Sequence, residues 1–195
     1  RDACIGIAAF LGVGKPEEAR SFLAWLLHAG RLSRPHLPVL FTLDGRRGPP
    51  ETALWDWPGY AGSVPVRVGN GAAGQHQLDG YGWVLEAGWL LTAAGHQLYG
   101  ETWRTLAGFA DEVARVWTEP DAGIWEQRNT PAHHVHSKLM AWLALDRAIR
   151  IAVVRRDRRV GRRRRWERAR AALGADVRRR GFDEARGTYT ATYGS

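Results

Sequence analysis

Two kinds of helical segment alternate along this chain, and the alternation restricts how it can fold. Residues 1–12 and 138–154 are apolar on more than one face, whereas residues 15–30 carry a single apolar stripe through Phe22 and Leu26. A helix that is apolar all round is buried by its neighbours, while an amphipathic helix covers a core with one face. The alternation therefore predicts an inner layer of odd-numbered helices covered by an outer layer of even-numbered helices.

Apolar residues at helical spacing predict six helices, little strand and an all-α fold. Pro16 marks the first turn of the second helix, Pro120 stops the fourth, and Ser137 is the expected N-cap of the fifth. Residues 182–195 indicate extended or turn structure. The expected helices lie in residues 1–12, 15–30, 72–94, 102–117, 138–154 and the Arg-rich segment that follows.

The connections between these helices differ in length. Those leading into the third and fifth helices are long, about 40 and about 20 residues, and long loops inside a compact domain are usually functional. If the odd-numbered helices form the inner layer, their N-terminal ends and both long loops meet on one face. That face would carry Arg1, Asp2, Gln77, Asp79, Trp125 and Glu126.

The net charge of +8 raises the question of an anionic partner, since all but two of the 28 basic residues are arginines. The densest cluster, residues 155–170, is interrupted by Asp157 and Glu167 and holds one aromatic residue, whereas single-strand binders usually offer several stacking platforms. Apolar residues also follow helical spacing beneath it. A solvated helix face therefore ranks first and a nucleic-acid-binding protein last, and we expect no nucleic acid partner. The apolar residues beneath the cluster are Trp166, Ala169, Leu173 and Val177.

The sequence shows few features that would indicate a disulfide, a membrane span, a metal or a cofactor. Cys4 is the only cysteine, so the chain forms no internal disulfide, and a reducing, cytoplasmic location is expected. No apolar run approaches the length of about 18 residues that a membrane span requires. His133, His134 and His136 lack well-spaced acidic or cysteine ligands, so we expect no metal and no cofactor. The sequence leaves the oligomeric state open.

The segment "PDAGIWEQR", residues 120–128, places a lone carboxylate, Glu126, directly after Trp125. An apolar neighbour that removes water from a carboxylate raises its pKa, which favours the protonated form that can act as an acid. An exposed loop acid beside a core tryptophan is the alternative, and the peptide alone leaves both interpretations open.

Four ordered segments resemble motifs of the bacterial members of glycoside hydrolase family 15, the glucoamylase and trehalase family. The resemblance extends to the last residues, "RGFDEARGTYTATYGS". It implies an (α/α)6 toroid of twelve helices, of which this chain supplies roughly six, the N-terminal half. Residues 1–195 are then expected to be part of a catalytic domain that is truncated at both ends. The segments are "RDACIGIAAFLGVGKPEEARSFLAWLL", "GYAGSVPVRVGNGAAGQHQLDGYG", "PDAGIWEQR" and "HSKLMAWLALDRAI".

The resemblance also implies a reaction, the hydrolysis of an α-glucosidic bond with inversion. It identifies Glu126 as the general acid, with the general base expected in a C-terminal half beyond Ser195. Arg1 and Asp2 match residues that hydrogen-bond sugar hydroxyls, and Trp125 would pack against the sugar. Further expected substrate-binding residues are Arg67, Asn70, Gln77, Asp79 and Arg128.

The chain departs from the family pattern at three positions, where Pro38, Phe41 and Trp83 replace polar or aromatic residues that family members commonly have. Two substrates remain open, an α-1,4-linked maltodextrin and the disaccharide trehalose. A non-catalytic or degenerate carbohydrate-binding module is the alternative from another functional class. In each of these cases the expected partner is a saccharide of α-linked glucose.

Overall fold

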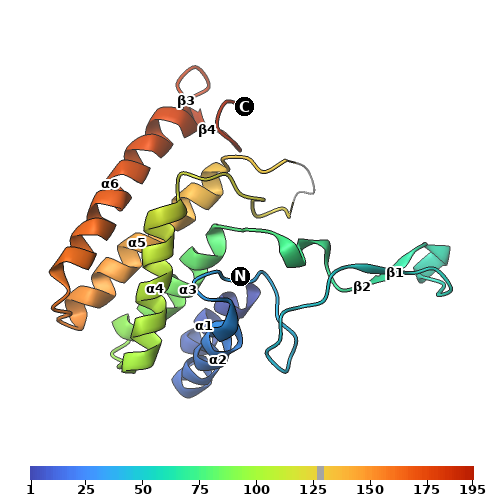
Figure 1. Cartoon of the computed structure of the whole chain (residues 1–195), viewed down its shortest axis with the longest axis horizontal. Coiled ribbons are helices and arrows are strands. Elements are labelled where there is room, and N and C mark those ends of the chain that lie inside the picture. Colours follow the sequence, from blue (N-terminus) through green and yellow to red (C-terminus); the bar gives the residue numbers. More distant parts are fainter. Residues whose placement is uncertain (127–129) are drawn as a thin grey trace.

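The computed structural model describes residues 1–126 and 130–195 and confirms the all-α fold class (Figure 1). Six α-helices account for most of the described residues. The third and fourth helices end near the expected residues, because Gly95 and Pro120 follow them. The helices are α1 (Asp2–Gly12), α2 (Pro16–Ala29), α3 (Asp79–Ala93), α4 (Gly100–Val116), α5 (Val135–Val154) and α6 (Val160–Gly181).

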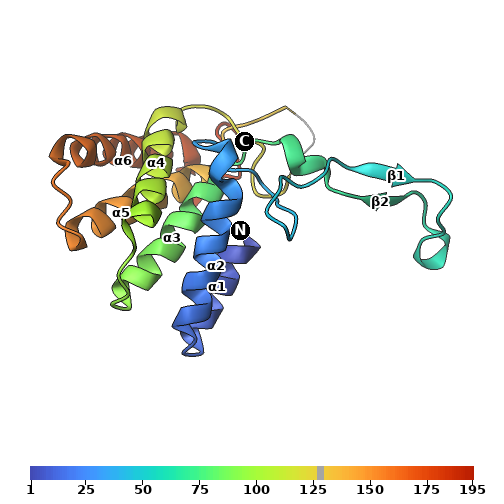
Figure 2. The same cartoon turned by 60° about the horizontal axis from the view of Figure 1, so that its bottom comes forward.

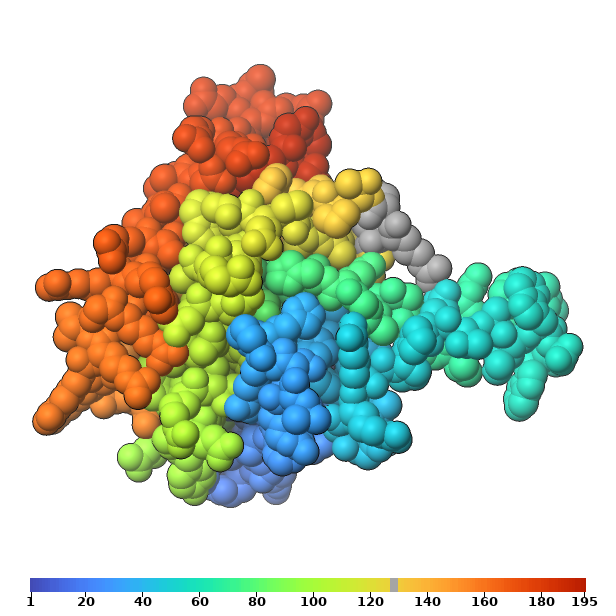
Figure 3. Space-filling view, in the orientation of Figure 1, coloured from blue at the N-terminus to red at the C-terminus, as the bar shows by residue number. Residues whose placement is uncertain are grey.

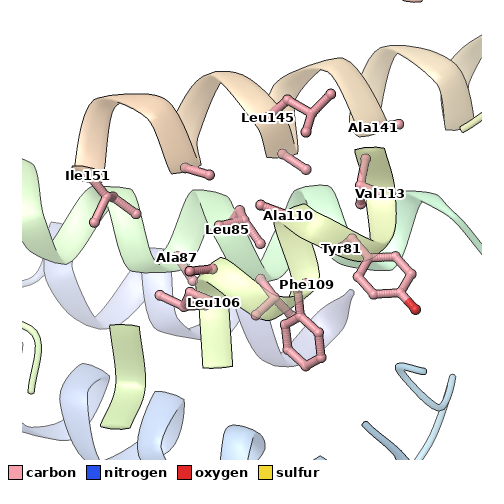
Figure 4. Close-up of a cluster of buried hydrophobic side chains, with 14 of the residues drawn as sticks. Tyr81, Leu85, Ala87, Leu106, Phe109, Ala110, Val113, Ala141, Leu145 and Ile151 are labelled. Atoms are coloured by element: carbon pink, nitrogen blue, oxygen red, sulfur yellow. The ribbon is translucent and has the colours of Figure 1, made fainter. Parts of the chain in front are cut away.

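The helices form two layers, as their alternating character predicts. Helices α1, α3 and α5 pack against one another in succession, and α2, α4 and α6 cover them on one side (Figures 1 and 2). The core lies between the layers, where side chains from α3, α4 and α5 meet (Figure 4). This is the arrangement of half an (α/α)6 toroid. Buried members of the core include Leu85, Leu106, Phe109, Val113, Leu145 and Ile151.

Helix α1 is less buried than its apolar sequence predicts. Cys4 and Ile7 are buried, but Ile5 is 50% exposed and Phe10 is 37% exposed. The reason is that α1 lies at one edge of the inner layer, where its main helix contacts in the described chain are with α2 and α3. Its outer face therefore meets no neighbour within the part of the chain that the structure describes.

Two of the expected helix boundaries are wrong. Residues 72–78 do not begin α3, because Asn70 caps a short 3-10 helix, Gly71–Gly74, and the chain then leaves helical structure before Leu78 caps α3. Helix α5 begins at Val135 rather than after Ser137, which is buried within the helix. The backbone N–H of Val135 donates to Ala191 O (3.1 Å), so pairing with the C-terminal segment fixes an earlier start.

Short strands form two small antiparallel pairs. Strands β1 (Thr52–Leu54) and β2 (Val66–Val68) pair with Thr52 opposite Val68. The segment that they enclose projects from the helical body as an arm (Figures 1 to 3). Strands β3 (Phe182–Asp183) and β4 (Thr188–Tyr189) form the turn after α6.

Helix α6 carries its arginines outward, as expected of a solvated helix face. Trp166, Leu173 and Val177 are buried beneath the charged surface. On the outer layer, the Asp111 carboxylate of α4 accepts hydrogen bonds from Arg162, Arg165 and the Trp166 indole N–H. The arginines at the α4–α6 contact therefore serve to join the two helices.

Within residues 1–126 and 130–195, none of the helices is both long enough and apolar enough to cross a lipid bilayer.

The close approach of α3 and α5 generates a stability prediction. A Cβ atom added at Gly82 would lie 2.4 Å from Met140 O of α5, whereas one added at Gly108 of α4 would meet nothing within 4 Å. We expect Gly82→Ala to destabilise the chain by about 1–3 kcal/mol through overpacking. Gly108→Ala should stabilise it by about 0.5–1 kcal/mol, because alanine restricts the unfolded chain. Urea denaturation of both variants measures this, and equal effects would contradict the close packing.

Candidate active site

The N-terminal ends of the inner helices and the long loops meet at one end of the helical body, as the sequence predicts. Arg1 Nε donates to Asp79 Oδ2 (3.1 Å), which joins the start of α1 to the start of α3. The backbone N–H of Ala122 donates to His76 O (3.1 Å), which joins the loop before α5 to the residues before α3. Three segments that lie far apart in the sequence thus form one surface.

A continuous chain of hydrogen bonds runs across this surface from Arg1 to Glu126. Arg1 donates to Gln77 Oε1 (3.2 Å), and Gln77 Nε2 donates to Gln75 Oε1 (3.0 Å). Gln75 Nε2 then donates to the backbone carbonyl of Glu126 (3.3 Å). Polar contacts between side chains therefore connect Glu126 to Arg1 across three separate segments.

Asn70 contacts the carboxylate of Glu126 directly. Its Oδ1 accepts the backbone N–H of Ala72 (2.8 Å), so its Nδ2 is turned towards Glu126 and donates to Oε2 (3.4 Å). Oε2 already accepts a hydrogen from Asn70 Nδ2, and an acid proton pointing the same way would collide with that hydrogen. When Glu126 is protonated, the proton is therefore favoured on the other oxygen, Oε1. Oε1 is then the atom of Glu126 that is suited to give up a proton.

The turn that carries Glu126 has an unusual backbone. Glu126 has φ +52° and Gly123 has φ +71°. A left-handed conformation at a residue with a side chain costs about 1 kcal/mol and is found preferentially at functional sites. Gly123 is also required sterically, because a Cβ atom there would lie 2.7 Å from the His134 ring.

A cavity of about 520 Å³ opens beside these residues, between α1, α2, the start of α3 and the loop 37–43. One side is polar and includes Arg1, Asp2, Gln77, Asp79 and Glu126. The other side is apolar. It is lined by Ala3, Phe22, Trp25, Leu26, Leu37, Pro38, Val39, Leu40, Phe41, Leu43, Gly80 and Val84.

The polar side offers hydrogen-bonding groups that the described residues do not use. Asp79 is fully buried, and among the described residues its Oδ1 has no hydrogen-bond partner. A buried acceptor without a partner costs about 1–3 kcal/mol, so such a group is expected where a ligand supplies the donor. Arg1 has five guanidinium N–H donors, and among the described residues it uses two of them, on Asp79 and Gln77.

The structure separates two of the predicted residues, Trp125 and Arg67, from the cavity. Trp125 is 84% exposed and is not among the residues lining the cavity, so its ring does not form the expected apolar wall against Glu126. Arg67 lies on β2 of the projecting arm, where it pairs with Glu51 (Nε–Oε1 3.4 Å). Arg128 falls outside the described residues. The remaining predicted residues lie together.

Sequence reasoning missed several residues that shape the site. Gln75 links Gln77 to Glu126, and Phe22 and Trp25 of α2 line the apolar side of the cavity. The apolar stripe of α2 through Phe22 predicts which side of the helix faces the core. It does not predict which residues on that side line a cavity. Tyr81 holds the loop 37–43 in place, since its hydroxyl accepts the N–H of Leu37 (3.1 Å), and burial raises its pKa to about 12.

The histidines before α5 serve as packing groups in this structure. The His133 ring stacks on Tyr193 with 5.6 Å between ring centroids, and burial lowers the pKa of His133. His134 packs against Gly123. No group of three or more metal-ligating side chains gathers within the described part of the chain.

Comparison with known proteins agrees with the resemblance of the motifs. The model of glycosyl hydrolases family 15 matches residues 1–195. The chain belongs to this family. Family 15 thus accounts for the two-layered helices and for the whole length of this chain.

The curated relatives are named trehalases. The chain is 34% identical to the trehalase of Mycolicibacterium smegmatis over 197 residues and 33% identical to that of Mycobacterium tuberculosis. The trehalase of Thermoplasma acidophilum is 32% identical. All of this chain is covered in each comparison, but it spans only 29%, 28% and 33% of these relatives' lengths. No solved structure is significantly similar to the chain.

A buried lysine connects α5 to the end of α4. Lys138 of α5 is 1% exposed, and its Nζ donates to the carbonyls of Trp117 (2.6 Å) and Glu119 (2.5 Å) at the end of α4. Burial lowers the pKa of Lys138 from 10.5 to about 8, while nearby Asp121 acts in the opposite direction. A cation at a helix C-terminus is stabilising, which explains why the charge is tolerated.

The lowered pKa predicts a pH-dependent stability. Between pH 8 and 10.5 the unfolded chain holds more protons on Lys138 than the folded chain, so stability from this group rises with pH. Cys4 acts oppositely, because burial raises its pKa to about 11. The Lys138→Met variant retains Cys4, so the difference in unfolding free energy between the parent and this variant reports the contribution of the lysine. From pH 7 to 10 the unfolding free energy of the parent should rise by about 2–3 kcal/mol relative to this variant.

The other lysine provides the matched control for these urea titrations. Lys15 is exposed, and Lys15→Met should leave the difference from the parent nearly constant over the same pH range. Parallel stability curves for the parent and Lys138→Met would show that Lys138 keeps an ordinary pKa.

Proposed function

We propose that this chain is part of a family 15 catalytic domain that hydrolyses trehalose with inversion, and that Glu126 is its general acid. The observation that carries the proposal is the cavity in which Glu126 and the Arg1–Asp79 pair lie on the same polar side. Trehalose is favoured over maltodextrin because the curated relatives reported above are named trehalases.

The polar groups of the cavity fit the binding of a glucose ring. Hydroxyls on a sugar ring act as donors and acceptors in fixed directions, so a site needs both kinds of partner close together. The free oxygen of Asp79 accepts from one hydroxyl, and the unused N–H groups of Arg1 donate to a neighbouring oxygen. Asp2 and Gln77 extend the polar side, while Trp25 offers an aromatic face to the apolar side of the sugar.

Glu126 then performs the proton transfer. Its Oε1 protonates the glycosidic oxygen as the bond to the leaving sugar breaks, and Oε2 stays hydrogen-bonded to Asn70. In an inverting reaction a second carboxylate activates water on the opposite face of the ring, about 6.5 to 9.5 Å from the acid. We place this base outside residues 1–195, in the other half of the toroid.

The division of the two carboxylates predicts how the chain behaves by itself. We expect no release of glucose from trehalose, maltose or maltodextrin, because Glu126 can donate a proton but cannot activate water on the opposite face of the sugar. Prolonged incubation with enzymatic glucose detection measures this. Glucose release that Glu126→Gln abolishes would show that the chain carries its own base and would contradict the division.

A chimera tests the role of Glu126 directly. This chain replaces the segment of the Mycolicibacterium smegmatis trehalase that it matches, and trehalose hydrolysis is measured. Glu126→Gln keeps the shape of the side chain but cannot transfer a proton, so kcat should fall by about 10²- to 10⁴-fold with little change in KM. Direct observation of the first anomer released should show β-glucose from the bond that is cleaved with inversion.

Glu184→Gln makes the same chemical change on the exposed turn after α6 and should leave the kinetic constants unchanged. A Glu126→Gln chimera with near-normal kcat would remove Glu126 as the acid. A folded chimera that hydrolyses neither trehalose nor maltodextrin would count against the proposed function as a whole.

A further inference from the structure

A buried acid, Asp121, lies five residues before Glu126 and takes no part in the proposed proton transfer. It is 1% exposed and does not line the cavity. Its Oδ2 accepts the backbone N–H of Leu78 (2.9 Å), the residue that precedes α3. A carboxylate is costly to bury, so this position needs a physical reason.

The surroundings of Asp121 join two segments of the site. Its backbone exchanges hydrogen bonds with Ala132, both of 3.0 Å, and the next residue, Ala122, donates to His76 O. The bond to Leu78 N–H completes the contact with the residues before α3. The segment that carries Asp121 leads along the chain to Glu126. The segment that carries Leu78 also carries Gln77 and Asp79.

Two groups near Asp121 connect it to the neighbouring helices. Leu78 N–H lies at the N-terminus of α3, where the helix dipole stabilises a negative charge. On the side of α5, the ammonium group of Lys138 is near enough to interact electrostatically with Asp121. Lys138 in turn binds the last carbonyls of α4, so the loop 117–126 is held at both of its ends.

We propose that Asp121 is a positioning residue, whose carboxylate fixes the distance between Glu126 and the Arg1–Asp79 pair by binding Leu78 N–H. This inference rests on the proposed function of Glu126. The hydrogen bonds from Gln75 and Asn70 to Glu126 are long, at 3.3 and 3.4 Å, and do not by themselves set its position firmly. A displacement of about 1 Å between a catalytic group and its substrate can lower the rate by about 10²-fold.

The first experiment measures the contact in the chain itself, independently of activity. Asp121→Ala removes the acceptor of Leu78 N–H, so amide hydrogen exchange at Leu78 and Ala122 should become at least tenfold faster. The amide of Phe109, within α4, should keep its protection. Asp121→Asn retains one acceptor oxygen and should preserve part of the protection at Leu78.

The control for this experiment is another carboxylate that binds backbone N–H groups. Asp183 accepts the N–H of Ala185 (3.0 Å) and of Arg186 (3.1 Å) at an exposed turn. Asp183→Ala should leave exchange at Leu78 unchanged. If Asp121→Ala raises exchange throughout the molecule, the exchange of the Asp121→Asn variant tests the proposal instead. Unaltered protection of the Ala122 amide in that variant supports the proposal, and loss of protection throughout the molecule overturns it.

The second experiment measures the chemical consequence in the trehalase chimera. Asp121→Ala should lower kcat by about 10- to 100-fold with a smaller change in KM, and Asp121→Asn should recover part of the loss. Val113→Ala, a core substitution in α4, serves as the control for lost stability. It should leave kcat near the parent value at temperatures where both variants are folded.

The two experiments separate failure of this inference from failure of the proposed function. Normal exchange at Leu78 in Asp121→Ala, or a normal kcat in the active chimera, would overturn the positioning role. If Glu126→Gln retains activity, the proposed acid is wrong, whereas the exchange result still reports whether Asp121 holds the two segments together.

Discussion

The close packing of α3 against α5 is the constraint on which the rest of this structure depends. At Gly82 the backbone of α3 approaches Met140 O so closely that no side chain fits between them. These two inner helices bury most of the core, together with α4 (Figure 4). Their closeness also brings the residues before α3 next to the loop before α5, which is where the candidate site lies.

The candidate site contains several energetically unfavourable features, which the end of a helical layer without a function would not need. Asp79 and Asp121 are buried carboxylates, each with one oxygen that has no partner within the described residues. Glu126 has a left-handed backbone conformation although it is not glycine. Departures of this kind from the usual rules of stability cluster at functional sites, because function selects the geometry and the surrounding core supplies the stability.

The charge of the chain has a structural use where α6 meets α4 and α5. Arg147, Arg150 and Arg170 surround the buried Asp146 carboxylate of α5, as Arg162 and Arg165 do for Asp111. Arg170 joins α6 to α5, and Arg162 and Arg165 join α6 to α4, whereas Arg147 and Arg150 pair with Asp146 within α5. The high net charge is therefore compatible with a saccharide-binding protein and does not by itself indicate a polyanion partner.

The sequence by itself determined the six helices and their two layers, because apolar spacing is a local property of the chain. The choice of Glu126 as the acid came from the resemblance of its motif and stays a prediction. The sequence did not determine the early start of α5, which depends on pairing between Val135 and Ala191. Only the tertiary structure joined Arg1 to Asp79, placed Arg67 on the projecting arm and left Trp125 exposed. The physical reason is that a periodic pattern shows which side of a helix is apolar. Contacts between distant loops depend instead on the hydrogen bonds that those loops make once the helices have packed.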